Sequence, residues 1–132
     1  MKRFFVFYLP ALIWAAVIFS LSHIPYIQTP DLGFNVTDKM AHFGVYAILG
    51  YLVIRAMTLN QPARMTWRNL LLAGIIAMLY AASDEVHQMF VPGRVAEIGD
   101  FIADSSGVIC AIVVFWLMSK LLEAMKVRFR NN

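Results

Sequence analysis

The sequence predicts an all-α fold, a four-span transmembrane helix bundle that forms one domain over residues 1–132. Of these residues, 61% are hydrophobic and 14% are charged, whereas soluble domains are about 45–50% apolar and about 25% charged. A chain this short has too little interior for so much apolar side chain, so part of it must face lipid. Disorder would need a polar chain, and a disulfide scaffold needs more than the single Cys110.

Four apolar stretches are long enough to cross about 30 Å of hydrocarbon, which takes about 17–25 helical residues. Backbone amides in lipid must bond within their own segment, which favours helices over strands. The expected spans lie near residues 4–21, 41–59, 70–90 and 101–122.

The first stretch also resembles a secretory signal, because Lys2 and Arg3 precede an apolar run that ends near Ser20 and Ser22. The run is long for a signal peptide, so we expect it to remain as the first span. Pro10 is compatible with this, since membrane helices tolerate proline.

The positions of Lys and Arg predict the orientation, because loops rich in them stay in the cytoplasm. Nine of the eleven fall at the two ends or between the second and third spans: Lys2, Arg3, Arg55, Arg64, Arg68, Lys120, Lys126, Arg128 and Arg130. Only Lys39 and Arg94 lie on the other side. We therefore expect both termini in the cytoplasm. The net charge of +3 reflects topology and does not indicate a nucleic-acid partner.

Acidic residues and histidines gather on the opposite, outer side. The group consists of Asp31, Asp38, Asp84, Glu85, Glu97, Asp100, Asp104, His23, His42 and His87, with Glu123 alone inside. Acidic residues have little influence on topology, so the positive-inside rule does not explain this clustering. It indicates a function on the outer side.

Helical spacing places several of these groups on shared faces. The sets are Asp38, His42 and Tyr46 on the second helix, Tyr80, Asp84 and Gln88 with Glu85 beside them on the third, and Asp100 and Asp104 on the fourth. Ionisable side chains in a span normally face the bundle interior or a wet cavity. On the fourth helix, Ala103, Gly107 and Ala111 form a small-residue stripe that favours close helix packing.

The segment Val91-Pro92-Gly93-Arg94 predicts a tight turn, because Pro sets one backbone angle and Gly permits the next. Such a short connection makes the third and fourth helices antiparallel neighbours. It brings Asp84 and Glu85 toward Asp100 and Asp104, and the second helix begins on the same side. Five carboxylates, those of Asp38, Asp84, Glu85, Asp100 and Asp104, thus converge with the cations Lys39 and Arg94. Because like charges repel strongly at low dielectric, some acids must be protonated, hydrated or matched by a bound cation.

These elements resemble the VanZ-like family of membrane proteins. The matching motifs are D-K-x-x-H-F at 38–43 with Tyr46, D-E-x-x-Q at 84–88 after Ser83, P-G-R at 92–94, and Asp100 with Gly107. The resemblance spans nearly the whole chain, including the segment from Ser20 to Pro25. Two positions depart from it: the family usually has Asn at the position of Asp104 and often Gly at that of Ala111. The first departure puts in doubt the transfer of any role for position 104.

The resemblance implies a small multi-pass protein of the bacterial inner membrane and cell envelope. The family takes its name from glycopeptide resistance, chiefly to teicoplanin, and its molecular activity is poorly defined. An antibiotic phenotype is thus an expectation from resemblance alone.

Three interpretations of the polar cluster remain open from the residues. The first is an ion-paired structural network tied by Lys39 and Arg94. The second is a pocket in which acids meet a cationic head group while Tyr46, Tyr80 and Phe90 hold an apolar tail, and Lys39 and Arg94 are equally suited to a phosphate. The third is a catalytic centre. In the third, Asp38 with His42, or Asp84 with His87, supplies metal ligands or an oriented base for reaction at a lipid-linked phosphate. Transport is disfavoured, because the polar groups occupy one side only.

We predict an outward-facing pocket that recognises or modifies a lipid-linked or glycopeptide molecule at the outer leaflet. Its candidate catalytic residues are Asp38, His42, Asp84 and Glu85, and its candidate ligand-binding residues are Lys39, Tyr46, Gln88, Arg94, Asp100 and Asp104. Membrane lipids are expected partners. Whether the protein is an enzyme, its cofactor, any bound metal and its oligomeric state are left open by the sequence.

Overall fold

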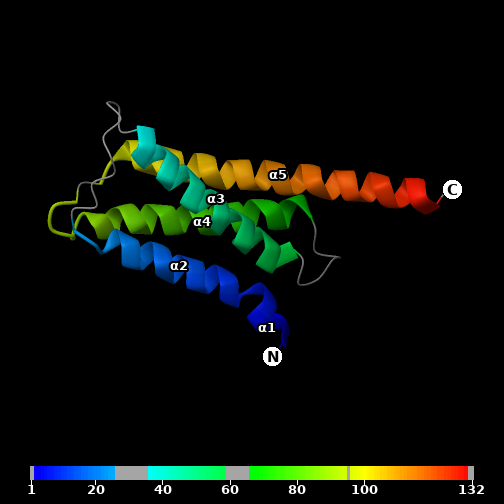
Figure 1. The fold of residues 1–132 in the computed structure, drawn as a ribbon, viewed down its shortest axis with the longest axis horizontal. Helices are drawn as coiled ribbons and strands as arrows, with labels where there is room; N and C mark the ends of the chain where they lie inside the picture. The colour runs from blue at the N-terminus through cyan, green and yellow to red at the C-terminus, as the bar shows by residue number, and fades with distance from the viewer. Residues whose placement is uncertain (1, 26–35, 59–65, 95, 131–132) are drawn as a thin grey trace.

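The computed structural model describes residues 2–25, 36–58, 66–94 and 96–130. Five helices account for its regular structure, and these ranges contain no strand: α1 (Lys2–Phe7), α2 (Leu9–Ser22), α3 (Val36–Thr58), α4 (Trp67–Gln88) and α5 (Ile98–Arg130). Figure 1 shows α4 running alongside α5 while α3 crosses both obliquely, and α2 packs against α3 and α4. The all-α prediction is confirmed. Asp31, Arg64 and Leu59, the expected end of the second span, lie outside the described residues.

Three helices, α3, α4 and α5, are long and apolar enough to cross a membrane, and α2 is a shorter apolar helix. The expected first span is therefore divided into α1 and α2. Pro10 explains the division, because it has no N–H to donate to the carbonyl four residues before it. Helical hydrogen bonds continue across the junction, from Tyr8 N to Phe4 O (2.9 Å) and from Leu12 N to Tyr8 O (3.1 Å).

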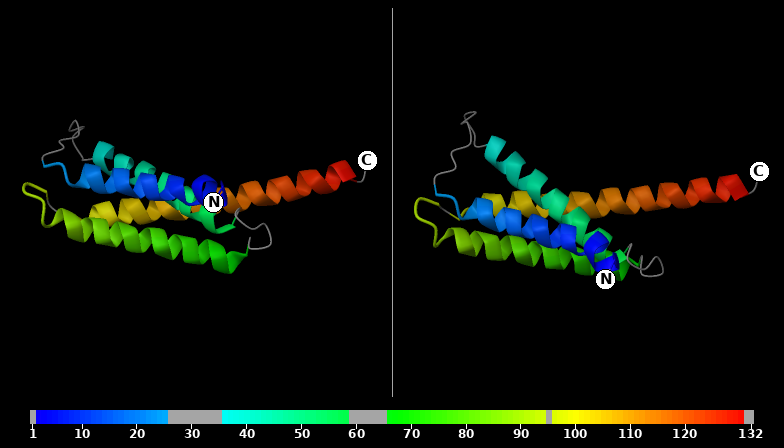
Figure 2. Two further views of the ribbon diagram at one scale, coloured as in Figure 1. Left: turned by 90° about the horizontal axis from the view of Figure 1, so that it is seen from below. Right: turned by 60° about the horizontal axis from the view of Figure 1, so that its bottom comes forward.

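Two helices extend beyond the predicted apolar stretches. Helix α3 begins at Val36, so Asp38 lies in its first turn, where a carboxylate is favourable near the positive end of the helix dipole. Helix α5 continues to Arg130, since Lys, Leu, Glu, Ala and Met are good helix formers even where the chain turns polar. Its last part projects past the other helices (Figure 2).

The closest packing in the bundle joins α3 to α5. A Cβ on Gly107 would lie only 2.2 Å from the Phe43 carbonyl oxygen and 2.9 Å from Ala47 N. One turn further on, Ala111 packs against Gly50 of α3, at whose position a Cβ would lie 3.2 Å from the Ala111 Cβ. The small-residue stripe of the sequence thus serves helix contact, and it fixes the depth at which α3 side chains meet those of α5.

The turn between α4 and α5 has the predicted form. Arg94 N donates to Val91 O (3.1 Å), and Gly93 has a φ of 83°. This positive φ is favourable only for a residue without a Cβ, and Pro92 precedes it as in a type II turn. Helices α4 and α5 consequently run antiparallel, which brings the end of α4 next to the start of α5.

The surface of the bundle is strongly apolar. Large side chains such as Leu79 and Ile102 on α4 and α5 are more than half exposed, and every helix carries others like them. Soluble monomers rarely expose continuous apolar surface on this scale. With the length and hydropathy of α3, α4 and α5, this surface is that of a multi-pass membrane protein.

Candidate functional site

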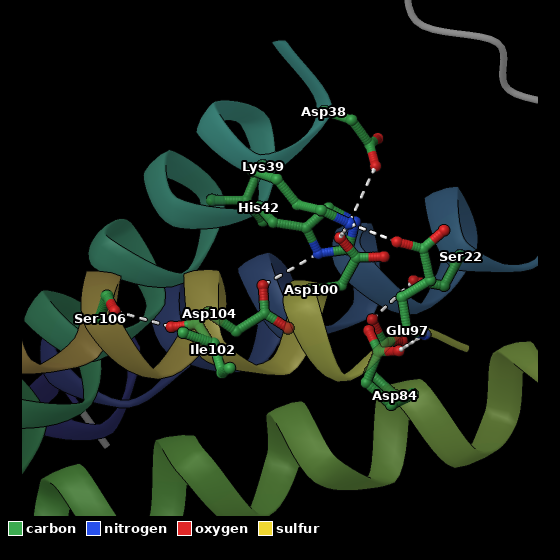
Figure 3. A network of polar contacts seen from close by, with 12 residues as sticks. Ser22, Asp38, Lys39, His42, Asp84, Glu97, Asp100, Ile102, Asp104 and Ser106 are labelled. Atoms are coloured by element: carbon green, nitrogen blue, oxygen red, sulfur yellow. Dashed lines mark hydrogen bonds and ion pairs between the residues drawn. The ribbon is translucent and has the colours of Figure 1, made fainter. Parts of the chain in front are cut away.

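The predicted site residues gather at one end of the bundle, where α2 and α4 end and α3 and α5 begin; we call this the polar end (Figures 1 and 3). The residues come from α3 (Asp38, Lys39, His42, Tyr46), α4 (Asp84, Glu85, Gln88), the turn (Arg94) and α5 (Asp100, Asp104). Six of the ten are buried. The site forms because helical spacing puts the α3 residues on one face and Gly107 lets that face approach α5.

Lys39 forms the centre of an ion-pair network at the polar end. Its Nζ donates to Glu97 Oε2 (2.7 Å) and to Asp100 Oδ1, and it lies 4.0 Å from Asp38 Oδ2 (Figure 3). The Asp100 side chain is buried, so this ammonium group offsets much of the free energy of desolvating its carboxylate.

His42 and Asp104 form a second pair, deeper in the bundle. His42 Nδ1 lies 2.9 Å from Asp104 Oδ1, and the Asp104 side chain is 0% exposed. A carboxylate in this position fixes the orientation of the imidazole ring. The arrangement is one used by proteins to orient a base or a metal-binding histidine.

Asp84 is held by neighbours from two helices. Its Oδ2 accepts hydrogen bonds from Ser22 Oγ of α2 (2.8 Å) and from Gln88 Nε2 one turn along α4 (3.2 Å). The Tyr46 ring is 1% exposed and packs near Tyr80, with ring centroids 6.5 Å apart. Tyr80 in turn donates to Ala15 O of α2 (2.7 Å).

Glu85 faces the start of α5. Its Oε2 accepts a hydrogen bond from Glu97 N (3.2 Å), which ties the end of α4 to the segment leading into α5. Glu85 and Asp104 both lie close to His42, because a carboxylate oxygen of each lies within 4.8 Å of an imidazole nitrogen of His42.

Arg94 contacts the end of α2 rather than the acids. Its Nη2 donates to Leu21 O (3.0 Å) and its Nε to Ile24 O (3.2 Å). Both carbonyls lie at or just beyond the C-terminal end of α2, where a guanidinium is favourable near the negative end of the helix dipole. In the described part of the chain Arg94 forms no ion pair, and the expected tie between Arg94 and the carboxylates is absent from these residues.

Several buried polar atoms lack a hydrogen-bond partner among the described residues. They are Asp84 Oδ1, Glu85 Oε1, Asp104 Oδ2, Tyr46 Oη, Thr37 Oγ1 and Ser105 Oγ. Buried polar atoms are nearly always paired with protein or ordered water, so water or a ligand group at this place would find several hydrogen-bond partners.

A cavity of about 130 Å³ opens between α2, α3 and α4. Its apolar lining residues are Ile18, Leu21, Ala41 and Val45. Its polar lining residues are Ser22, Asp38, His42, Tyr46, Asp84, Gln88 and Arg94. Lys39, Glu85, Asp100 and Asp104 do not line it.

Within the part of the chain that the structure describes, two groups of side chains have the composition of a metal site: Asp38 with His42 and Asp100, and His42 with Glu85 and Asp104. The pairing of Asp84 with His87 that the sequence offered does not occur in either group. His87 lies instead against His23 of α2, with Nε2 and Nδ1 3.3 Å apart, and stacks on Phe19. Helical spacing alone could not distinguish these neighbours, because α2 determines which one His87 meets.

Sequence reasoning left Ser22 and Glu97 out of the site. Ser22 is the α2 residue that donates to Asp84, and Glu97 connects Lys39 with Glu85. The position of Glu97 just ahead of a helix rich in acids was a usable signal. For Ser22 the sequence offered only its place at the end of an apolar stretch.

Comparison with known proteins gives one positive finding. The family model described as VanZ/LLP1 matches residues 5–119, which includes every predicted site residue. No curated protein and no solved structure matches the chain.

Proposed function

The chain belongs to the VanZ/LLP1 family, and from this premise we propose that it is a bacterial cell-envelope protein that binds a lipid-linked or glycopeptide molecule in the cavity between α2, α3 and α4. The observation that supports binding is that apolar side chains and acidic groups line the same cavity. Pockets for amphiphilic ligands combine apolar walls with a few convergent polar groups.

The two acidic residues that line the cavity favour a ligand that donates hydrogen bonds. Asp84 Oδ1 has no partner among the residues described, while its Oδ2 is already engaged by Ser22 and Gln88. Since Asp38 adds a second carboxylate and Arg94 is committed to the end of α2, an amine or a hydroxyl-rich head group suits the cavity better than an anion.

The size of the cavity limits what enters. A volume of 130 Å³ is below the 300–1,000 Å³ typical of pockets that enclose a whole drug-sized molecule. We therefore propose that only the polar head of the ligand is held between the helices. For a glycopeptide such as teicoplanin, an amino group would enter while the bulk stays outside.

The proposal includes the arrangement in the membrane. The helical hydrogen bonds that join α1 to α2 give about 30 Å of helix from Lys2 to Ser22, enough for a fourth span. With the basic residues at the opposite end, the polar end faces outward from the bacterial inner membrane and both termini lie in the cytoplasm.

A binding titration tests the proposal. The purified protein in nanodiscs is titrated with teicoplanin and with a lipid-linked cell-wall precursor, and the dissociation constants are compared with those of Asp84→Asn. We expect one ligand to bind at least about tenfold more weakly to the variant, because a charged hydrogen bond contributes about 1.5–3 kcal/mol. Glu123→Gln, far from the polar end and paired with Lys120, is the control. Equal affinity of the wild type and Asp84→Asn would contradict the proposal.

A second candidate is hydrolysis or transfer at a lipid-linked phosphate. The observation that favours it is the bond between His42 Nδ1 and Asp104 Oδ1, which orients the imidazole as a general base. Conversion of the lipid-linked precursor during the titration, seen by mass spectrometry, would identify this activity. The network of Lys39, Glu97 and Asp100 fits a structural role, but it leaves the unpaired oxygens of Asp84, Glu85 and Asp104 unexplained.

A further inference from the structure

The acids of the polar end differ in how their charge is balanced. Lys39 is shared by Glu97 and Asp100, with Asp38 close by. Within residues 2–25, 36–58, 66–94 and 96–130, no Lys or Arg pairs with Asp84, Glu85 or Asp104. All three of these carboxyl groups are buried.

Glu85 and Asp104 also carry oxygens with nothing to bind in the described structure. Asp104 Oδ2 belongs to a side chain that is 0% exposed, and Glu85 Oε1 to a residue that is 8% exposed. Buried carboxylates are stable when they are paired or when they coordinate a metal ion. His42 engages Asp104 Oδ1, and Glu97 N donates to Glu85 Oε2. These contacts orient the two side chains and leave the other oxygen of each available.

We propose that His42, Glu85 and Asp104 bind a divalent transition-metal ion. They come from three different helices, α3, α4 and α5, and their ligand atoms all lie within 4.8 Å of one another. Ligand atoms of a tetrahedral Zn²⁺ at about 2.1 Å are about 3.4 Å apart. Small rotations of the two carboxyl groups, without movement of the helices, close the remaining difference.

The donor set determines the class of metal. One imidazole and two carboxylates suit Zn²⁺ or Mn²⁺, whereas Mg²⁺ and Ca²⁺ prefer oxygen alone and Cu⁺ prefers sulfur. The other group, Asp38 with His42 and Asp100, is a poorer site because the Lys39 ammonium already lies against Asp100. Three protein ligands leave a further coordination position, as in zinc enzymes.

This metal site is distinct from the ligand-binding cavity proposed above but adjoins it. His42 also lines the cavity, whereas Glu85 and Asp104 do not, so the ion lies behind the cavity wall. Metal binding is measured without any lipid or antibiotic, so it can succeed or fail independently of the binding function.

The test uses the full chain in detergent, stripped with a chelator and then dialysed against Zn²⁺ or Mn²⁺ with metal content measured by mass spectrometry. We expect about one ion per chain, and affinity at least about tenfold weaker in Glu85→Gln and in Asp104→Asn. Both variants keep the size of the side chain and remove its charge. The matched control is Glu97→Gln, which changes an exposed carboxylate on the Lys39 network and should bind as the wild type does.

The inference is overturned if the wild type holds no stoichiometric metal, if both variants bind unchanged, or if Glu97→Gln loses the ion equally. Should a variant fail to fold, the wild type provides a second measurement. Pulsed electron paramagnetic resonance of the Mn²⁺-loaded protein should show coupling between the ion and a histidine nitrogen. Loss of this coupling in His42→Gln would assign the nitrogen to His42. Absence of nitrogen coupling in the loaded wild type also overturns the inference.

Discussion

At the polar end, the charge balance of Glu97 and Asp100 depends on Lys39. Its ammonium group contacts Glu97 and Asp100 from one position in the first turns of α3, and so connects α3 to the start of α5. The partners differ in burial, because the Asp100 side chain is 7% exposed and that of Glu97 is 49% exposed. An exposed carboxylate without a partner remains hydrated, whereas a buried one is destabilising.

Replacing Lys39 by Met should therefore lower the free energy of unfolding by about 1–3 kcal/mol, because Asp100 is left buried without its cation. The double variant Lys39→Met/Asp100→Asn should recover at least half of this loss, since it removes the unpaired charge. Thermal unfolding in detergent measures both. If the second substitution recovered nothing, the ion pair would not be the source of the effect.

At the scale of elements, α3 and α5 approach closely enough that one methyl group matters. The Gly107 position has no space for a Cβ, because backbone atoms of Phe43 and Ala47 occupy it. This close contact places His42 beside Asp104, one turn before Gly107 on the same face of α5. Helix packing and site geometry are thus consequences of the same contact.

Gly107→Ala should destabilise the bundle by about 1–3 kcal/mol, because α3 and α5 must separate to admit the methyl group. Gly44→Ala is the control on α3: nothing lies within 4 Å of its Cβ, and Ala is the better helix former by about 1 kcal/mol. We expect it to be neutral or stabilising. Unfolding midpoints of the two variants that coincide would exclude close packing as the cause.

Elements were predictable where a local rule determined them. Pro92 and Gly93 required a turn whatever surrounded them, and apolar length was enough to locate α3, α4 and α5. The end of α5 was not predictable from apolarity, since its last turns are stabilised by helix propensity and by Arg128 and Arg130 near the negative end of the dipole.

The candidate site was predictable only in part, because it depends on two kinds of information. Helical periodicity placed Asp38, His42 and Tyr46 on one face of α3, and the turn joined the end of α4 to the start of α5. The acid that Lys39 contacts depends on how α3 packs against α5, and the contacts of Arg94 depend on where α2 ends in space. Residue spacing within one helix cannot predict how separate helices lie relative to one another.

At the scale of the whole molecule, charge and polarity are separated along the bundle axis. The described acids other than Glu123, and the histidines, lie at the polar end, while Lys120, Lys126, Arg128 and Arg130 lie on the projecting part of α5 at the other (Figure 2). Between them the helices expose apolar side chains. The proposed orientation follows from this polarity, because basic segments are retained in the cytoplasm.

Cysteine accessibility tests that orientation. In a Cys110→Ser background, Met89→Cys at the polar end and Phe129→Cys near the end of α5 each provide an exposed thiol. A membrane-impermeant maleimide should label Met89→Cys in spheroplasts and Phe129→Cys only after permeabilisation, because basic segments are retained in the cytoplasm. Each site is the control for the other, since both should react fully once the membrane is opened. The reverse pattern would place the polar end in the cytoplasm, where the cavity could not reach an outer-leaflet ligand, and would contradict the proposed envelope function.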